Sequence, residues 1–173
     1  MRSIACGLIF ALAAILSGCG YHVAGKADLL PKDIKVIAIP AFGNVSTRYK
    51  LAERLPGDLT REFIARTRYQ VVADPNQADA VLYGSVINLF SGATVYDPQT
   101  NRASGAQIIV VLQLTLQDRH TGKVLFSRPN MDFRERYEIS VDPKVYFDES
   151  DAALARLSRD VARSVVSAVV ENF

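Results

Sequence analysis

The sequence of 173 residues has no tryptophan, two cysteines and two histidines, and its charges almost balance at +2. Two cysteines are too few for a disulfide scaffold or a zinc cage. The near-neutral charge argues against a nucleic-acid-binding domain, which normally carries a strongly basic face. A hydrophobic content of 49% and the absence of a short repeat exclude a disordered, collagen-like or coiled-coil chain. One globular domain that mixes helices and strands remains.

A long hydrophobic run is also missing, since the apolar N-terminal run covers only residues 4–16. A membrane-spanning helix needs about 20 apolar residues, so this run fits the core of a signal peptide. It ends in Leu16-Ser17-Gly18-Cys19, and small residues directly before a cysteine resemble the lipobox of bacterial lipoproteins. We therefore expect a signal peptide over residues 1–18, with diacylglycerol and an N-acyl chain on Cys19. An ordinary secretory signal with an incidental cysteine is the alternative.

Several acyl chains on Cys19 would hold the protein stably on a membrane without spanning it. Gly20, rather than an aspartate, follows the cysteine. By resemblance to bacterial lipoproteins, this favours the periplasmic face of the outer membrane. We expect residues 19–33 to be a lipidated tether and residues 34–173 to be a single domain. No cofactor is expected apart from the covalent lipid.

Hydrophobic periodicity predicts the first elements of that domain. The segment 34–40 is rich in β-branched residues and predicts a strand that is buried on both faces. A hydrophobic residue at every fourth position over residues 51–63 predicts a helix that ends near residue 67. Pro56 inside this pattern predicts either a kink near Leu55 or a helix that restarts with the proline in its first turn.

A short strand over residues 69–73 is followed by three long predicted strands. The first, over residues 80–96, contains Ser91-Gly92, where a mid-strand glycine predicts a bulge or a bend. The second alternates apolar and polar side chains over residues 108–117, which indicates that one of its faces belongs to the core. A tight turn leads from it into the third strand, over residues 123–138.

The last predicted element is a helix over residues 149–172, with capping oxygens and negative charge from Asp148, Ser150 and Asp151 at its start. The order of strand, helix, short strand, three-stranded meander and helix indicates an α+β fold. We expect a two-layer α/β sandwich, in which two helices cover one face of a mixed, mostly antiparallel sheet.

Motifs for catalysis and metal binding are missing. The segment from Gly20 to Lys26 fits the start of a P-loop, but Ala27 replaces the Ser or Thr that would hold magnesium, and no strand precedes it. The sequence contains neither an HExxH motif nor a Gly-x-Ser-x-Gly nucleophile elbow. We therefore expect neither an enzyme nor a metal site.

Four segments together resemble the LPS-assembly lipoprotein (LptE) family of Gram-negative bacteria. They are CGYHVAG directly after the lipobox, IKVIAIPAFGN, REFIARTRYQVV and ADAVLYGSV. The resemblance implies a lipoprotein that forms a stable complex with the LptD β-barrel, plugs it, supports its assembly and contacts lipopolysaccharide on its way to the outer leaflet. An accessory or pore lipoprotein of another outer-membrane secretion or assembly system is the alternative. A periplasmic enzyme is a third class, which the missing motifs disfavour.

The strand with alternating side chains supplies the candidates for contact with a barrel. The lumen of a large barrel is polar, so a plug must present polar groups to its inner wall. If the helices cover the apolar face, Gln113, Thr115 and Gln117 lie on the other face and are barrel-contact candidates. Simple exposure to solvent is an equally good interpretation.

The expected topology also supplies candidates for contact with lipopolysaccharide. In an antiparallel meander, the segments 97–105 and 140–147 lie at one end of the sheet and the turn at 119–123 lies at the other. Each of the first two segments contributes a cation that suits lipid A phosphates. The candidates are Arg102 and Lys144, followed by the turn cations Arg119 and Lys123. Solvated loop charge is the alternative.

Overall fold

The computed structural model describes residues 30–139 and 143–171, with side chains in the second range from Ser150 onward. Its elements in chain order are β1 (Val36–Ala38), β2 (Gly43–Asn44), α2 (Lys50–Arg66), β3 (Gln70–Val72), the 3-10 helix η1 (Pro75–Gln77), β4 (Ala80–Tyr96), β5 (Ala103–Asp118), β6 (Val124–Glu138) and α3 (Pro143–Glu171). This order agrees with the expected strand, helix, short strand, meander and helix.

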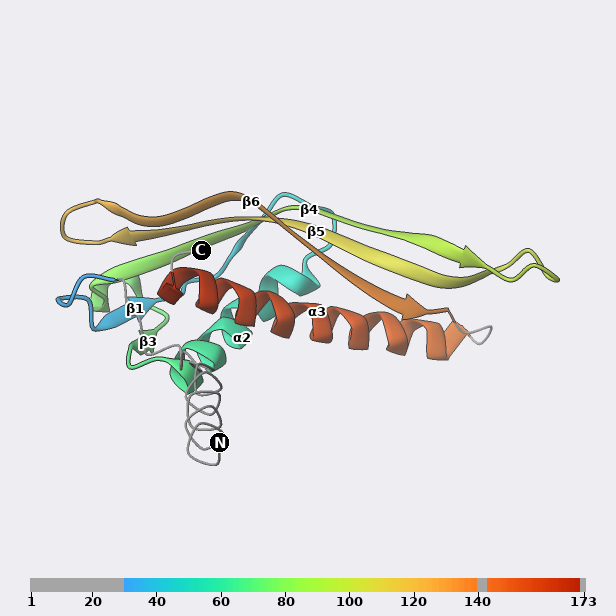
Figure 1. Cartoon of the computed structure of the whole chain (residues 1–173), viewed down its shortest axis with the longest axis horizontal. Coiled ribbons are helices and arrows are strands. Elements are labelled where there is room, and N and C mark those ends of the chain that lie inside the picture. The colour runs from blue at the N-terminus through green and yellow to red at the C-terminus, as the bar shows by residue number, and fades with distance from the viewer. Residues whose placement is uncertain (1–29, 140–142, 172–173) are drawn as a thin grey trace, which may run out of the picture.

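The strands form one mixed sheet, in the order β3-β1-β4-β5-β6. β1 runs parallel to β3 and β4, whereas β4, β5 and β6 form an antiparallel meander. Both helices lie on the same side of the long strands (Figure 1). The predicted two-layer α/β sandwich is therefore confirmed. The short strand β2, which pairs with β4 at Ser85 and Val86, was not predicted, because two residues show no periodicity.

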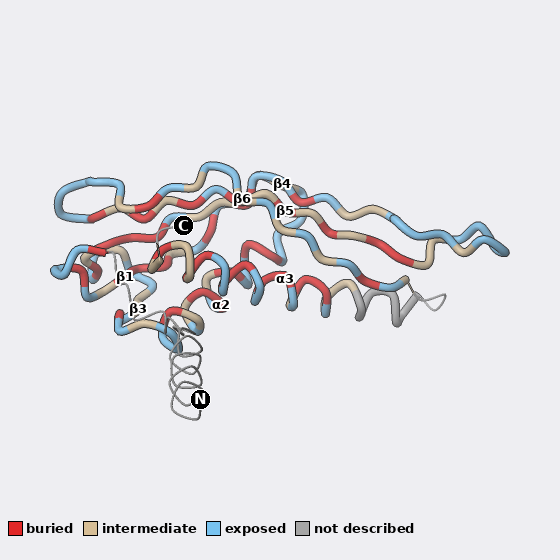
Figure 2. Tube along the Cα trace, viewed as in Figure 1, coloured by how far each residue is buried: buried red, intermediate tan, exposed pale blue. Residues whose placement is uncertain are grey.

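The hydrophobic core lies between the sheet and the two helices. On β5, the even-numbered residues from Ala106 to Leu116 are buried, which confirms the predicted alternation. The helices contribute two apolar stripes, Leu51, Leu55, Leu59 and Phe63 from α2 and Leu154, Leu157, Val161 and Val165 from α3. Each fully buried Leu, Val or Phe side chain stabilises the fold by about 1.5–3 kcal/mol. The tip of the β4–β5 hairpin lies outside this core and is exposed (Figure 2).

Each helix departs from the prediction in one respect. α2 is one helix from Lys50 to Arg66 with Pro56 inside it, so the predicted restart at the proline is wrong. The packing of its continuous apolar stripe offsets the hydrogen bond that proline cannot donate. The predicted kink near Leu55 stays a prediction.

α3 begins at Pro143 instead of residue 149, because proline is well suited to the first turn of a helix. The predicted capping residues therefore lie inside α3, where they do not cap its start. Asp151 instead accepts hydrogen bonds from Lys50 Nζ of α2, the shorter at 2.8 Å.

The predicted irregularity of β4 lies at other positions. Ser91 and Gly92 pair regularly with Ile108 and Gln107 of β5, so the predicted bulge at these two residues is wrong. The register shifts instead between Val86 and Asn88, and again beyond Ala93. A glycine allows a bulge but does not require one. The absence of a side chain at Gly92 instead leaves room for the ring of Phe90, which an added Cβ would meet at 2.8 Å.

The folded domain begins earlier than residue 34. Leu30 is only 6% exposed and belongs to the core, and the Ile34 amide donates a hydrogen bond to the carbonyl of Pro31 at 3.1 Å. The last residues of the predicted tether are thus part of the fold. Cys19 and the rest of the predicted tether lie outside the described residues.

Candidate functional site

The long sheet separates two ends of the molecule. β4 has 17 residues, and at about 3.3 Å per residue it spans roughly 55 Å. The described chain enters the fold at one end, which we call the entry end, beside the start of β4 and the turn between β5 and β6. The β4–β5 turn, residues 97–102, forms the opposite end and extends beyond the first turn of α3 (Figure 1). We call it the distal tip.

Two buried or half-buried carboxylates organise the entry end. Asp79 accepts hydrogen bonds from the backbone amides of Lys35 and Val36, at 2.8 and 2.9 Å. These two amides lower the pKa of Asp79, with smaller contributions from the charges of His120 and Lys35. Asp118 accepts from the amides of His120 and Thr121, both at 2.8 Å, and these hydrogen bonds lower its pKa as well. The entry end is therefore held by charge-assisted hydrogen bonds.

The two cations predicted at this turn differ in their surroundings. Arg119 donates from Nε to the carbonyl of Ala78 at 2.8 Å, so its guanidinium holds the turn against the loop before β4. Lys123 is exposed, and its backbone amide bonds the hydroxyl of Thr121 at 3.3 Å. A role for Arg119 in the local fold is thus visible in the structure, whereas lipopolysaccharide contact by either cation stays a prediction.

The distal tip is a tight turn that presents Arg102 to solvent. The carboxylate of Asp97 accepts from the amides of Gln99 and Thr100, at 2.8 and 2.9 Å, and these two amides lower its pKa. Asn101 has a φ of 53°, a left-handed conformation that asparagine tolerates better than most residues. The carbonyl of Arg102 accepts from the amide of Asp97 at 2.8 Å, and its side chain is exposed.

The end of β6 lies beside the start of β5, as the predicted meander requires. The Ile139 amide donates to the carbonyl of Ser104 at 3.0 Å. Lys144 lies in the first turn of α3, so its predicted position in a loop is wrong, because the helix starts earlier. The side chain of Lys144 lies outside the described residues, and its pairing with Arg102 stays a prediction.

An open groove of about 660 Å³ lies next to the distal tip. Apolar groups of Val95, Ala106 and Ile139 line it together with the polar side chains of Arg136 and Glu138. Tyr137 also lines the groove, and its hydroxyl group lies 3.1 Å from the hydroxyl group of Ser91, within hydrogen-bonding distance. The groove is thus lined by both apolar and polar groups, and its lining residues do not form a cluster of catalytic side chains.

The face of the sheet that the helices leave uncovered, which we call the open face, carries the predicted barrel-contact residues. Gln113 is exposed and Thr115 is half-buried on this face. Gln117 donates from its amide nitrogen to the carbonyl of Gly122 at 2.8 Å, so it also closes the turn. The structure thus places all three side chains on the expected face, and their contact with a barrel stays a prediction.

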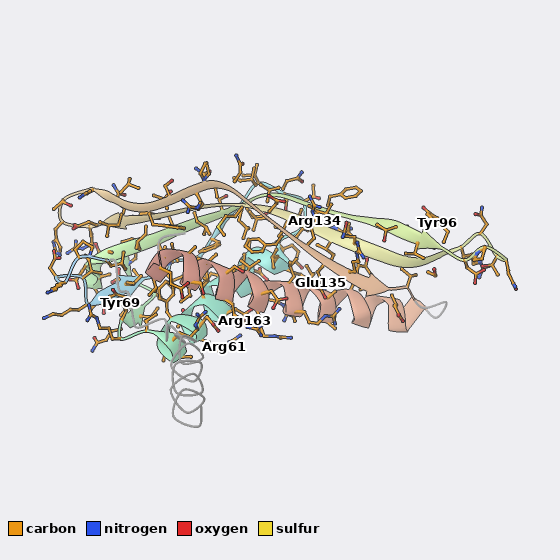
Figure 3. All side chains as sticks on the ribbon, viewed as in Figure 1. Arg61, Tyr69, Tyr96, Arg134, Glu135 and Arg163 are labelled. Carbon is orange, nitrogen blue, oxygen red and sulfur yellow. The ribbon has the colours of Figure 1, made fainter. Side chains whose placement is uncertain are left out.

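An apolar pair on the open face, Phe90 and Ile109, was not predicted. Phe90 is 60% exposed and pairs across the sheet with Ile109, which in turn pairs with Arg134. Arg134 points away from the helix layer, whereas the next residue, Glu135, points toward α3 (Figure 3) and accepts from Arg156 Nε at 2.6 Å. The exposure of Phe90 could not be predicted from the sequence, because Phe90 and its neighbour Leu89 are both apolar and so break the alternation of apolar and polar residues.

Residues 30–139 and 143–171 include no helix with the length and hydropathy of a membrane span. Among the side chains that the structure describes, residues 30–139 and 150–171, there is no group of three or more His, Cys, Asp or Glu that could hold a metal ion.

Solved structures show the same fold at low sequence identity. A lipoprotein B from Nitrosomonas europaea matches with a TM-score of 0.55 and 14% identity, over 87% of this chain and 90% of that one. A lipoprotein from Caulobacter crescentus matches with a TM-score of 0.54 and 15% identity, over 76% and 88%. A minor lipoprotein from Acinetobacter baumannii matches with a TM-score of 0.54 and 11% identity, over 82% and 95%.

The family comparison covers the folded domain. No curated protein matches the chain. The family model described as LptE, lipopolysaccharide-assembly, matches residues 34–169, which include all strands and helices except the last two residues of α3. The chain therefore belongs to the LptE family of lipopolysaccharide-assembly lipoproteins.

Proposed function

We propose that this lipoprotein is anchored through Cys19 to the periplasmic face of the outer membrane, where it forms a stable complex with an LptD-type β-barrel. In this complex it plugs the barrel, helps it assemble, and assists the transport of lipopolysaccharide to the cell surface. The observation that carries the proposal is the match to the family over residues 34–169. The family is not enzymatic, and its role is one of binding and positioning.

The open face supports the barrel contact. A plug has to present a surface to the inner wall of the barrel while its own core stays closed. Here the helices cover one face of the sheet, so the other face can meet the wall without disturbing the core. Gln113 and Thr115 lie on that face in β5, between β4 and β6, and offer the polar groups that a polar lumen requires.

The distal tip supports the contact with lipopolysaccharide. Arg102 is exposed on a turn that Asp97 holds in a fixed conformation. A guanidinium presented on such a turn can bind a phosphate group with charge-assisted hydrogen bonds. Lys144, in the first turn of α3, lies at the same end of the molecule. We propose that these two cations bind lipid A phosphates. Arg119 and Lys123 are the alternative candidates for this contact.

The proposal is tested by isolating the lipidated full chain from detergent-solubilised outer membrane of its own cells. The expected result is recovery of an LptD-type barrel in a constant ratio. Photo-crosslinkers at Gln113 and Thr115 are expected to capture that barrel, and a crosslinker at the exposed Arg159 of α3 serves as a comparison on the helix layer. Recovery of a ring of copies of this chain, without a barrel, would instead support an accessory or pore lipoprotein of another secretion system.

A further inference from the structure

In the part of the chain that the structure describes, the distal half of β4 forms an edge of the sheet. On the side away from β5, β4 pairs with β1 at Ala80 and Val81 and with β2 at Ser85 and Val86. The last backbone contact on this side is the Val45 amide, which donates to the carbonyl of Val86 at 3.0 Å. Within residues 30–139 and 143–171, no strand pairs with this side of β4 beyond Val86. Every second residue of this segment therefore directs its backbone amide and carbonyl outward.

This edge lacks the features that normally protect a free strand. Natural edge strands carry lysine, other charges or proline, which discourage pairing with another chain. β4 has no charged residue and no proline from Ala80 to Tyr96. The opposite edge of the same sheet, β6, has Pro129 and several charges, among them Asp132, Arg134 and Arg136. The β6 edge is therefore protected against pairing with another chain, whereas the distal part of the β4 edge is not.

The unprotected edge has a defined length. Residues Asn88 to Ala93 pair with Val111 to Ala106 of β5 without a register shift, and a shift bounds this run at each end. Six residues are a typical strand length. The run carries Phe90, which is 60% exposed on the open face. An added strand could therefore form a regular ladder with this run and cover the ring of Phe90.

We propose that a short, extended and uncharged segment of the barrel partner adds to the sheet as a strand along Asn88–Ala93. This inference rests on the proposed function and names a surface through which the two proteins bind each other. Lipid cannot cover the edge, because it cannot satisfy the outward backbone groups. Only an extended polypeptide supplies both the hydrogen bonds and the apolar contact.

The added segment comes from a part of the partner outside the barrel wall. In a closed barrel, each wall strand already pairs on both sides. A loop or another segment that enters the lumen has free backbone groups and can pair with β4. The uncharged chemistry of β4 also selects an uncharged segment, since a buried charge at this edge would have no partner among residues 80–96.

A second copy of this chain fits the edge less well. Antiparallel pairing of two β4 strands centred on the regular run would place Val95 of one copy opposite Val86 of the other. That side of Val86 is already occupied by β2. Beyond Val95, β4 of the second copy would also continue into its own β4–β5 hairpin. The space between β2 and the distal tip therefore suits a short strand better than a 17-residue one.

The first test places a photo-crosslinking benzoylphenylalanine at position 90 of the full lipoprotein in its own cells. The control carries the same group at Arg134, which lies on the same face and in the same row, beside the other edge. From position 90, we expect capture of the barrel partner at a single uncharged segment outside its wall strands. Capture only of wall strands, or of a second copy of this chain, would overturn the inference.

The second test adds a charge to the edge. Phe90→Lys is compared with Ile64→Lys, because Ile64 on α2 is also 60% exposed and apolar. We expect Phe90→Lys to reduce the recovered barrel about tenfold, since a charge at an edge blocks strand addition. Ile64→Lys should leave recovery within about twofold, and both variants should keep the thermal midpoint of the wild type.

The two tests separate the inference from the proposed function. If the barrel is recovered and captured from Gln113 and Thr115, but Phe90→Lys recovers it as well as the wild type does, the inference is wrong and the proposed function stands. If no barrel is recovered with the wild-type lipoprotein, both are wrong.

Discussion

The buried hydroxyl of Ser158 on α3 donates a hydrogen bond to the carboxylate of Asp58 on α2. Ser158 is 0% exposed and Asp58 is 8% exposed, and the same carboxylate also accepts from Arg61. The pair joins two helices that run in the same direction, because Lys50 meets Asp151 near their starts and Arg66 meets Glu171 near their ends. Apolar stripes tolerate sliding, whereas this polar pair fits only one relative position of α2 and α3.

Ser158→Ala should lower the free energy of unfolding by about 1–3 kcal/mol, because it leaves one oxygen of a buried carboxylate without its donor. Replacing both partners, as in Asp58→Leu with Ser158→Ala, should cost less than the sum of the two single changes. Urea unfolding followed by circular dichroism measures all three variants. Additive losses would show that the two side chains do not act as a pair.

Gly84→Ala should destabilise the protein by about 1–3 kcal/mol, as overpacking of a core usually does. A Cβ at Gly84 would overlap the ring of Phe42, which is buried against β4. Gly92→Ala is the control, because its added Cβ would meet only the exposed ring of Phe90, which can move. Thermal unfolding should separate the two variants, and Phe42→Leu should partly rescue Gly84→Ala.

Asp79→Asn should make the stability less dependent on pH in the acidic range. The amides of Lys35 and Val36 lower the pKa of Asp79 in the folded state. Its stabilising contribution is therefore complete above the unfolded pKa of about 4 and is lost as the pH falls through the lower folded pKa. Near neutral pH, the variant should lose about 1–2 kcal/mol from the weakened hydrogen bonds.

Urea unfolding at pH 7 and at pH 3 checks this prediction. The wild type should lose more stability than Asp79→Asn between these two pH values. Equal losses would show that the carboxylate of Asp79 is not a source of the acid sensitivity. The same loss of stability between pH 7 and pH 3 can be compared for Asp97→Asn at the distal tip, because backbone amides also lower the pKa of that carboxylate.

Cys19→Ala should leave the protein unprocessed, or free in the inner membrane or periplasm, because the anchor depends on the acyl chains of this residue. Membrane fractionation and the mass of the mature protein measure the change. Cys6→Ala, inside the predicted signal peptide, should have no effect on either measurement. An unmodified thiol at Cys19 of the mature wild-type protein would overturn the predicted lipidation.

Arg102→Glu combined with Lys144→Glu should reduce lipopolysaccharide binding by about tenfold or more, because two charge-assisted contacts with phosphate become repulsive. Binding of purified lipopolysaccharide is measured on the folded variant, with circular dichroism as the check of folding. Arg159→Glu on the exposed side of α3, outside every candidate site, is the charge-reversal control. Unchanged binding in the double variant would remove this pair from the site, and Arg119 and Lys123 would be tested next.

Much of the fold was predictable because its longest elements have regular periods. The alternation of β5 predicted which of its residues are buried, and β4 begins and ends at the predicted residues 80 and 96. The start of α3 was predicted six residues late, because Asp148, Ser150 and Asp151 look like a cap, although helix starts also depend on packing. The bulges of β4 were displaced from Gly92, since strand register depends on both partners.

The sequence by itself determined the alternation of β5, the apolar stripes of both helices and the signal-peptide pattern before Cys19, because each depends on neighbours along the chain. Only the tertiary structure decided that Asp58 meets Ser158, that Phe42 covers Gly84 and that, within residues 30–139 and 143–171, no strand pairs with the outer side of β4 beyond Val86. These relationships join residues far apart in sequence. They depend on which strands lie side by side and where the covering layer ends, and no local period encodes that information.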